Sequence, residues 1–188
     1  MRDKIKDILL ESIRIKEELL RSNIGQIIEI TEMMIDSLKK GGKVILFGNG
    51  GSASDSEHIA AELVGRFKKD RRALPAIALT TNTSVLTSLA NDYGYEVVFA
   101  KQIEAFGGKN DVAVGISTSG KAKNVICGIK QAKKMGIKTV VLTGGDGGEL
   151  GKSADITLVV PSSITARIQE AHITIGHVIC ELVEESFL

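Results

Sequence analysis

Residues Lys43–Ser54 have the sequence KVILFGNGGSAS, which joins an apolar run to a glycine-rich turn. The apolar run Lys43–Gly48 has the length of a strand and does not alternate with polar residues, as is typical of strands buried on both faces. Three glycines in four residues then allow a tight turn, and Ser52 or Ser54 can cap a helix that follows. This order of strand, turn and helix predicts the first unit of an α/β fold.

Similar units follow along the rest of the chain. Further short apolar runs, rich in β-branched residues, cover Pro75–Thr80, Val112–Ser117, Thr139–Thr143 and Ile156–Val160. Helical patterns lie at about Ser52–Phe67, Tyr95–Phe106, Lys121–Met135 and Thr165–Glu185. This alternation predicts a three-layer, doubly wound, five-stranded parallel sheet with the flavodoxin-like strand order 2-1-3-4-5.

The N-terminal part of the chain is a helical arm. Apolar residues recur at helical spacing over residues 3–39, which predicts one long helix or two successive helices that end at Gly41-Gly42. The arm can cover the domain's own sheet or pack against another subunit, and its length favours the second. We therefore expect one domain over residues 1–188, with an oligomer-forming arm (1–40) and an α/β core (41–188).

The composition is that of an ordinary globular protein, with 188 residues, 43% of them hydrophobic and 25% charged. Lys plus Arg number 24 and Asp plus Glu 23, so the net charge of +1 argues against a strongly basic nucleic-acid binder. The charged residues after Met1 are unlike a secretory signal, and no apolar run reaches the ~20 residues of a membrane span. The two cysteines, Cys127 and Cys180, fit a reducing compartment. We expect a cytoplasmic protein that binds neither nucleic acid nor membrane.

Two strands end in loops suited to an anion. The glycine-rich turn follows the first strand, and Ser117-Thr118-Ser119-Gly120 follows the third, each opening a helix. Hydroxyls and helix N–H groups donate hydrogen bonds to phosphate oxygens, although either loop alone can be purely structural. No Walker lysine follows the first loop, which favours a single phosphate ester over a nucleoside triphosphate. Thr80–Ser84 and Asn91-Asp92 are further polar groups for sugar hydroxyls, or ordinary turn formers.

Titratable side chains on two predicted helices are candidates for metal binding or acid–base chemistry. His58 and Glu62 stand at i and i+4, so one helix face presents both, as a metal site or as a surface pair. Gln169 and His177 are separated by ~12 Å along the last helix, so they converge only by leaning together or with help from a neighbouring subunit.

For three further side chains, both a functional and a structural role are considered. His172 is expected to be structural, although it lies one turn from Gln169. Arg66 and Arg167 are phosphate or interface partners, or solvated surface charges.

Four motifs occur in one particular order along the chain. They are Gly48-Asn49-Gly50-Gly51-Ser52, His58-x-x-x-Glu62, Ile116-Ser117-Thr118-Ser119-Gly120 and Ala166-Arg167-Ile168-Gln169-Glu170-x-His172-x-x-x-x-His177. Together they resemble the phosphoheptose (sedoheptulose 7-phosphate) isomerase family, which has the sugar isomerase (SIS) fold. The likeness covers nearly the whole chain, and the combination of His58, Glu62, Gln169 and His177 is its most specific part.

The resemblance implies an isomerase that converts sedoheptulose 7-phosphate into D-glycero-D-manno-heptose 7-phosphate, a step towards nucleotide-activated heptose for lipopolysaccharide. It implies a homotetramer with Zn²⁺ held by the residues matching His58, Glu62, Gln169 and His177. Isomerisation through an enediol needs a base and an acid, for which Glu62 and His177 are the candidates. Residues implied to contact substrate are Asn49, Gly50, Gly51, Glu62, Asn91, Asp92, Ser117, Thr118, Ser119 and Gln169.

The chain departs from the family pattern at two positions. Ala122 stands where some relatives have serine, so one phosphate hydrogen bond worth on the order of 1 kcal/mol is missing. Ala166 stands where some have aspartate, and it is given no chemical role. The alternatives are a non-catalytic adaptor for the replication initiator, a sugar-phosphate sensor, or an isomerase of another sugar phosphate. Retention of Glu62 and His177 favours the enzyme over the adaptor.

Overall fold

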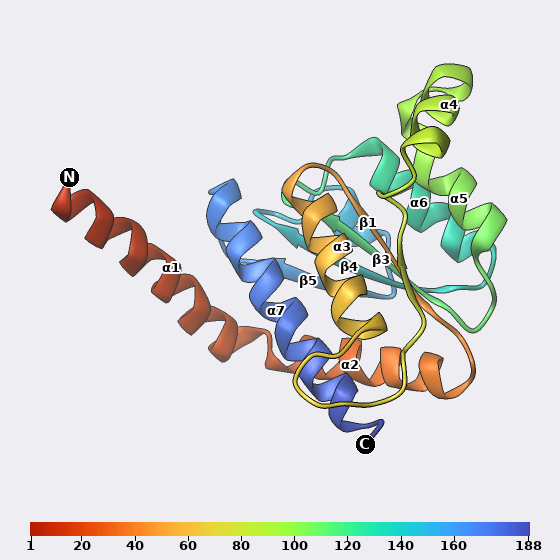
Figure 1. Cartoon of the computed structure of the whole chain (residues 1–188). Coiled ribbons are helices and arrows are strands. Elements are labelled where there is room, and N and C mark those ends of the chain that lie inside the picture. The colour runs from red at the N-terminus through yellow and green to blue at the C-terminus, as the bar shows by residue number, and fades with distance from the viewer.

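The computed structural model describes all 188 residues and is built around one parallel sheet of five strands (Figure 1). The strands are β1 (Val44–Gly48), β2 (Ala76–Ala78), β3 (Val112–Ser117), β4 (Lys138–Gly144) and β5 (Ile156–Val160). They lie in the order β2-β1-β3-β4-β5, and every neighbouring pair is parallel. The predicted three-layer α/β fold and its strand order are therefore confirmed.

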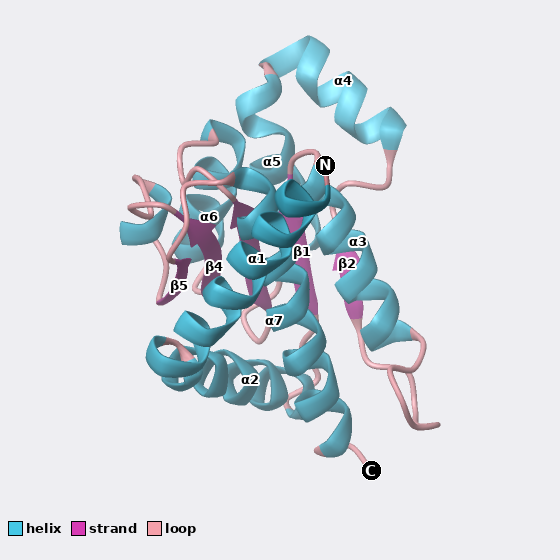
Figure 2. Ribbon diagram, turned by 90° about the vertical axis from the view of Figure 1, so that its left-hand side faces the viewer, coloured by secondary structure: helices cyan, strands magenta, loops and turns pink.

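Helices cover both faces of the sheet (Figure 2). They are α1 (Arg2–Ser22), α2 (Ile24–Lys39), α3 (Gly51–Val64), α4 (Thr83–Tyr93), α5 (Val98–Phe106), α6 (Lys123–Lys134) and α7 (Thr165–Glu185), with short 3₁₀ turns at η1 (Tyr95–Val97) and η2 (Leu150–Lys152). The predicted bounds of the last helix agree with α7 at both ends. None of these helices combines the length and apolar character that a membrane span requires.

Strand β1 shows why a continuous apolar run is needed at the centre of the sheet. Val44 and Leu46 belong to the core between the sheet and α2, α3 and α7, whereas Ile45 and Phe47 belong to the core under α5 and α6. All four side chains are fully buried, since successive residues of a strand point to opposite faces. Burying such a side chain contributes roughly 1.5–3 kcal/mol.

The N-terminal arm consists of two helices, because helical structure is interrupted at Asn23 between α1 and α2. Residues 1–10 are all exposed, and α1 extends away from the sheet past α7 (Figure 1). Only Ile15 and Leu19 of α1 are buried, and they join the core beneath α7. Most of the apolar face of α1 is therefore uncovered in the single chain.

Helix α4 was not predicted from the sequence, where Thr80–Ser84 and Asn91-Asp92 are interpreted as groups for sugar hydroxyls or as turn formers. The side chain of Asn82 accepts a hydrogen bond from the backbone N–H of Val85 (3.1 Å) and so caps the helix. No residue of α4 is buried, and the helix stands away from the sheet beyond α5 (Figures 1 and 2). The apolar residues of α4, Leu86, Leu89 and Ala90, are only partly buried against the core, and this short stripe lies among polar residues that also suit turns.

Candidate active site

His58, Glu62 and His177 meet between α3 and α7. The turn after β1 starts α3, which carries His58 and Glu62 one helical turn apart with 3.2 Å between His58 Nε2 and Glu62 Oε1. His177 approaches from α7, and its Nε2 lies 3.0 Å from Nε2 of His58. One ligand atom from each of the three residues lies within 4.8 Å of the others. The structure thus brings together three of the four predicted metal ligands, His58, Glu62 and His177, as one cluster, the metal group.

These three side chains fit a divalent metal ion. Tetrahedral zinc with bonds of 2.0–2.1 Å places neighbouring ligand atoms about 3.3 Å apart, close to both short separations in the group. Two imidazole nitrogens facing each other at 3.0 Å can share only one hydrogen, whereas both lone pairs can point at one cation. Half of the His58 side chain and a quarter of that of Glu62 remain exposed, so an ion and a substrate can reach the group.

The fourth predicted ligand, Gln169, lies against the glycine-rich turn. A Cβ atom on Gly51 would collide with the side-chain amide of Gln169. Glycine at position 51 therefore leaves room for the amide directly over the turn, and a side chain there would displace the Gln169 amide from this place. Gln169 and Gly51, both predicted to contact substrate, are neighbours in the structure.

The segment after α3 forms one wall of the metal group. The ring of Phe67 lies 5.5 Å from that of His177. Backbone N–H groups of Phe67, Lys68 and Lys69 all donate to the carboxylate of Glu184 at 2.8 Å. Arg71 Nε lies 3.3 Å from the same carboxylate, and both side chains are almost completely buried. Burial alone would raise the pKa of Glu184, but the backbone donors and Arg71 outweigh it and hold this pKa below its ordinary value.

Asp55 is a further acid beside this group, one helical turn before His58. Its Oδ2 atom is buried without a hydrogen-bond partner. Burial raises the pKa of Asp55 to about 6, and the neighbouring His58 partly offsets this. The sequence analysis did not single out Asp55, since nothing in its spacing indicates burial.

The predicted phosphate loop closes the carboxyl end of β3. Ser117 is buried, Thr118 is partly exposed and Ser119 is exposed, so the three hydroxyls run from the core outward. Gly120 has a positive φ of 64°, and a Cβ there would collide with the backbone of Gly147. The loop after β4 therefore packs directly against this one. Ala122 is the N-cap residue of α6 and makes no capping bond through its side chain.

Other predicted residues lie apart from the metal group. Asn91 and Asp92 are exposed on α4, where Asn91 Nδ2 donates to Asp92 Oδ1 (2.9 Å). His172 is fully buried, and its Nε2 lies 3.2 Å from the carbonyl oxygen of Thr143, which agrees with a structural role. Arg66 is exposed, whereas Arg167 pairs with Glu170 on the same helix.

The site also contains residues that the sequence analysis missed. Asn124 of α6 exchanges two hydrogen bonds with Asn49 of the glycine-rich turn, and the hydroxyl of Tyr95 donates to Asn49 at 3.2 Å. Asn124 follows the predicted phosphate loop by four residues, but its partner is 75 positions away. No local signal could have identified that partner.

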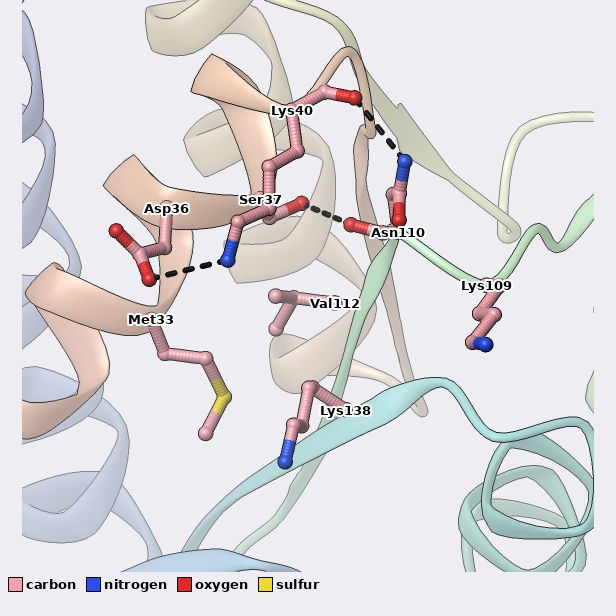
Figure 3. Close-up of a pocket in the computed structure, with 8 residues that line it drawn as sticks. All are labelled: Met33, Asp36, Ser37, Lys40, Lys109, Asn110, Val112 and Lys138. Atoms are coloured by element: carbon pink, nitrogen blue, oxygen red, sulfur yellow. Dashed lines mark hydrogen bonds and ion pairs between the residues drawn. The ribbon is translucent and has the colours of Figure 1, made fainter.

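A separate pocket of about 300 Å³ lies at the amino ends of the strands, opposite the candidate active site (Figure 3). Its lining includes Val112 and Lys138, the first residues of β3 and β4, and Asp36, which pairs with Lys40 at 3.4 Å. Ligands of open α/β sheets bind beyond the carboxyl ends of the strands. The position of this pocket therefore argues against it as the catalytic site.

Comparison with known proteins agrees with this fold and identifies the family. The family model described as SIS domain matches residues 9–144. The phosphoheptose isomerase of Aquifex aeolicus (strain VF5) is 55% identical over 185 residues, covering 98% of this chain and 97% of that protein. A solved phosphoheptose isomerase from Neisseria gonorrhoeae has a TM-score of 0.93 and 41% identity, and the match covers 98% of both chains.

The fold and the family model place the chain among the SIS-domain proteins. Three relatives that are 52–55% identical over nearly the whole chain are phosphoheptose isomerases. The chain belongs to the phosphoheptose isomerase family, a family of enzymes. This membership favours the isomerase over the adaptor and the sensor considered from the sequence.

Proposed function

We propose that this protein converts sedoheptulose 7-phosphate into D-glycero-D-manno-heptose 7-phosphate, in the biosynthesis of nucleotide-activated heptose for lipopolysaccharide. The observation that supports this most directly is the meeting of two imidazoles and a carboxylate within 4.8 Å. Proton transfer in isomerisation needs an acid and a base at one end of the substrate. Family membership supplies the second support.

The two loops hold the two ends of this substrate. The hydroxyls of Ser117, Thr118 and Ser119, with the N-terminus of α6, bind the phosphate as neutral donors. The remaining residues contact the sugar, namely Asn49, Gly50, Gly51, Asn91, Asp92 and Gln169. Anchoring the phosphate brings the carbonyl end to the metal group and gives the reacting atoms a defined position.

Glu62 is the base that removes the carbon-bound proton, and His177 is the acid or base that serves the oxygens. The proton leaves one of carbons 1 and 2 and returns to the other; through the cis-enediol the carbonyl oxygen gains a proton to become a hydroxyl, and the neighbouring hydroxyl loses its proton to become the new carbonyl. Glu62 can combine ligand and base roles, because Oε1 faces His58 at 3.2 Å and the second oxygen can take the proton.

Zinc is the proposed metal, held by His58, Glu62, Gln169 and His177. Two histidine nitrogens and a carboxylate oxygen are a common donor set for catalytic zinc. When bound, the ion supplies Lewis-acid polarisation of the carbonyl and hydroxyl oxygens.

A homotetramer is the proposed assembly, with residues 1–40 as the oligomer-forming arm and 41–188 as the core. Large apolar side chains on the arm remain exposed, namely Ile5, Ile8, Leu9, Leu10, Ile13, Leu20, Ile24 and Ile28. So many exposed large apolar side chains on two successive helices are typical of a subunit interface. We place the enzyme in the cytoplasm, where its two free cysteines remain reduced.

A coupled isomerase assay on sedoheptulose 7-phosphate, with and without chelator, tests the function. We expect turnover that disappears with chelator and returns with added Zn²⁺. Full activity after complete metal removal would contradict the metal role. No turnover under any metal condition would contradict the isomerase.

A further inference from the structure

The side chains of Asn49 and Asn124 form a reciprocal amide pair. Asn49 Nδ2 donates to Asn124 Oδ1 at 2.9 Å, and Asn124 Nδ2 donates to Asn49 Oδ1 at 2.8 Å. Each amide thus uses its donor and its acceptor on the other. Asn124 is 4% exposed, so the pair lies largely out of water, where an unpaired amide is costly.

The pair joins the beginnings of two helices from different parts of the chain. Asn49 begins the turn after β1, and its carbonyl oxygen accepts from the backbone N–H of Ser52 at the start of α3. Asn124 lies in the first turn of α6, and its Oδ1 also accepts from the backbone N–H of Val125 at 3.0 Å. A displacement of one helix start relative to the other breaks bonds at both amides together.

We infer that Asn124 is a positioning residue, which sets the separation between the glycine-rich turn and the phosphate loop through its amide pair with Asn49. The inference rests on the proposed function for the nature of the ligand, a sugar phosphate that spans the two loops. It also assigns the side chain of Asn49 to this pair. The substrate then meets the main chain of Asn49 and of the glycines that follow.

The expected consequence concerns ligands that touch both loops. A ligand held at one end and reacting at the other depends on the distance between the two ends, and a misplacement of about 1 Å can cost ~100-fold in rate. Inorganic phosphate needs only the loop at Ser117–Gly120 and the start of α6, not the glycine-rich turn. Loss of the pair should therefore weaken use of the whole substrate far more than binding of inorganic phosphate.

A double-mutant cycle tests this coupling. The proteins are wild type, Asn49→Ala, Asn124→Ala and the double variant, with kcat/KM measured on sedoheptulose 7-phosphate. Calorimetry on each protein measures binding of the whole substrate and of inorganic phosphate. Asn110→Ala is the matched control, because the amide of Asn110 donates to the carbonyl oxygen of Lys40 at the opposite edge of the sheet.

We expect Asn124→Ala to lower kcat/KM by roughly 10- to 100-fold. The double variant should lose about as much as this single variant, since both remove the same pair. Binding of inorganic phosphate should stay within roughly threefold of wild type, as one loop suffices for it. Asn110→Ala should match wild type throughout.

Other results would overturn the inference. These are wild-type kinetics in Asn124→Ala, a double variant whose loss is the product of the two single losses, or an equal loss of phosphate and substrate binding. If Asn124→Ala does not fold, Asn124→Asp keeps the side-chain volume and removes the donor to Asn49 for the same cycle. A wild-type protein that binds the sugar phosphate without turnover would count against the proposed function alone, and the binding data would still test the pair.

Discussion

The Nε2 atoms of His58 and His177 lie 3.0 Å apart, although 119 positions separate the two residues in the chain. Their rings are 5.0 Å apart between centroids and tilted by 51°, so the nitrogens approach each other without stacking of the rings. Two ligands of one ion approach each other in this way, and so do two imidazoles that share one N–H···N hydrogen bond.

Replacing one of these imidazoles should abolish tight metal binding. We expect His177→Ala to weaken zinc binding by at least roughly 100-fold, more than is typical when only a supporting residue is lost. Equilibrium dialysis with Zn²⁺ alone measures this without any turnover. Glu181→Gln, on the same helix, is the control that should bind as wild type. Stoichiometric zinc in His177→Ala at wild-type affinity would contradict the ligand assignment.

Glu62→Gln should remove the base and leave the fold intact. The amide keeps the size of the side chain but cannot accept the carbon-bound proton, so we expect kcat to fall by roughly 10²- to 10⁴-fold. Exchange of the substrate's carbon-bound hydrogen with deuterium in D₂O, followed by NMR, isolates this step. Exchange at the wild-type rate in the variant would assign the base elsewhere.

The sequence predicts well those features that depend on neighbouring residues. The bounds of β3, β5 and α7 follow from local apolar patterns and agree with the structure at both ends. Helix α4 was missed because it buries no residue and begins at an asparagine that also suits a turn. Its apolar residues Leu86, Leu89 and Ala90 are only partly buried against the core, and such a short stripe is a weak local signal.

The candidate site was predictable only in part, for a related reason. The i, i+4 spacing of His58 and Glu62 predicts a shared face, whereas the approach of His177 depends on how α7 packs against α3. That approach was expected from the family resemblance alone. Neither residue spacing nor the family resemblance predicted the pairing of Asn49 with Asn124, because the two residues meet only after the sheet brings β1 and β3 together.

Ala122→Ser should restore a missing cap at the start of α6. Ala122 has extended backbone angles at the N-cap, where a serine hydroxyl can accept from the helix N–H groups. We expect a gain in the free energy of unfolding of about 1 kcal/mol by urea denaturation. The hydroxyl also adds a phosphate donor, so KM for the sugar phosphate should fall several-fold, with kcat nearly unchanged. A higher KM in a stabilised variant would show that the substrate does not approach this helix start.

Glu184→Ala should destabilise the protein strongly, because the carboxylate serves three backbone N–H groups and the buried Arg71. Removing one partner of a buried pair typically costs 3–5 kcal/mol. The matched control is Glu181→Gln, which removes the exposed pair with Lys68 (2.6 Å) and should cost at most about 1 kcal/mol. Urea denaturation compares the two variants, and similar losses in both would refute the importance of the buried carboxylate.

His172 should make the stability of the protein fall in mild acid. Burial lowers the pKa of His172 to about 4, although its contact with the Thr143 carbonyl acts in the opposite direction. An unfolded histidine titrates near pH 6.5, so the unfolded state takes up the proton first as the pH falls. The contribution is thus fully present above about pH 6.5 and is lost progressively towards pH 4.

Between pH 7 and pH 5 this single group should lower the free energy of unfolding by on the order of 2 kcal/mol. His172→Gln keeps a donor for the Thr143 carbonyl oxygen and does not titrate, so its stability should fall much less over the same interval. Asp55, whose pKa burial raises to about 6, titrates in both proteins and cancels in the comparison. Urea denaturation of the two metal-free proteins at both pH values measures the difference. Parallel losses would mean that His172 titrates alike in the folded and unfolded states.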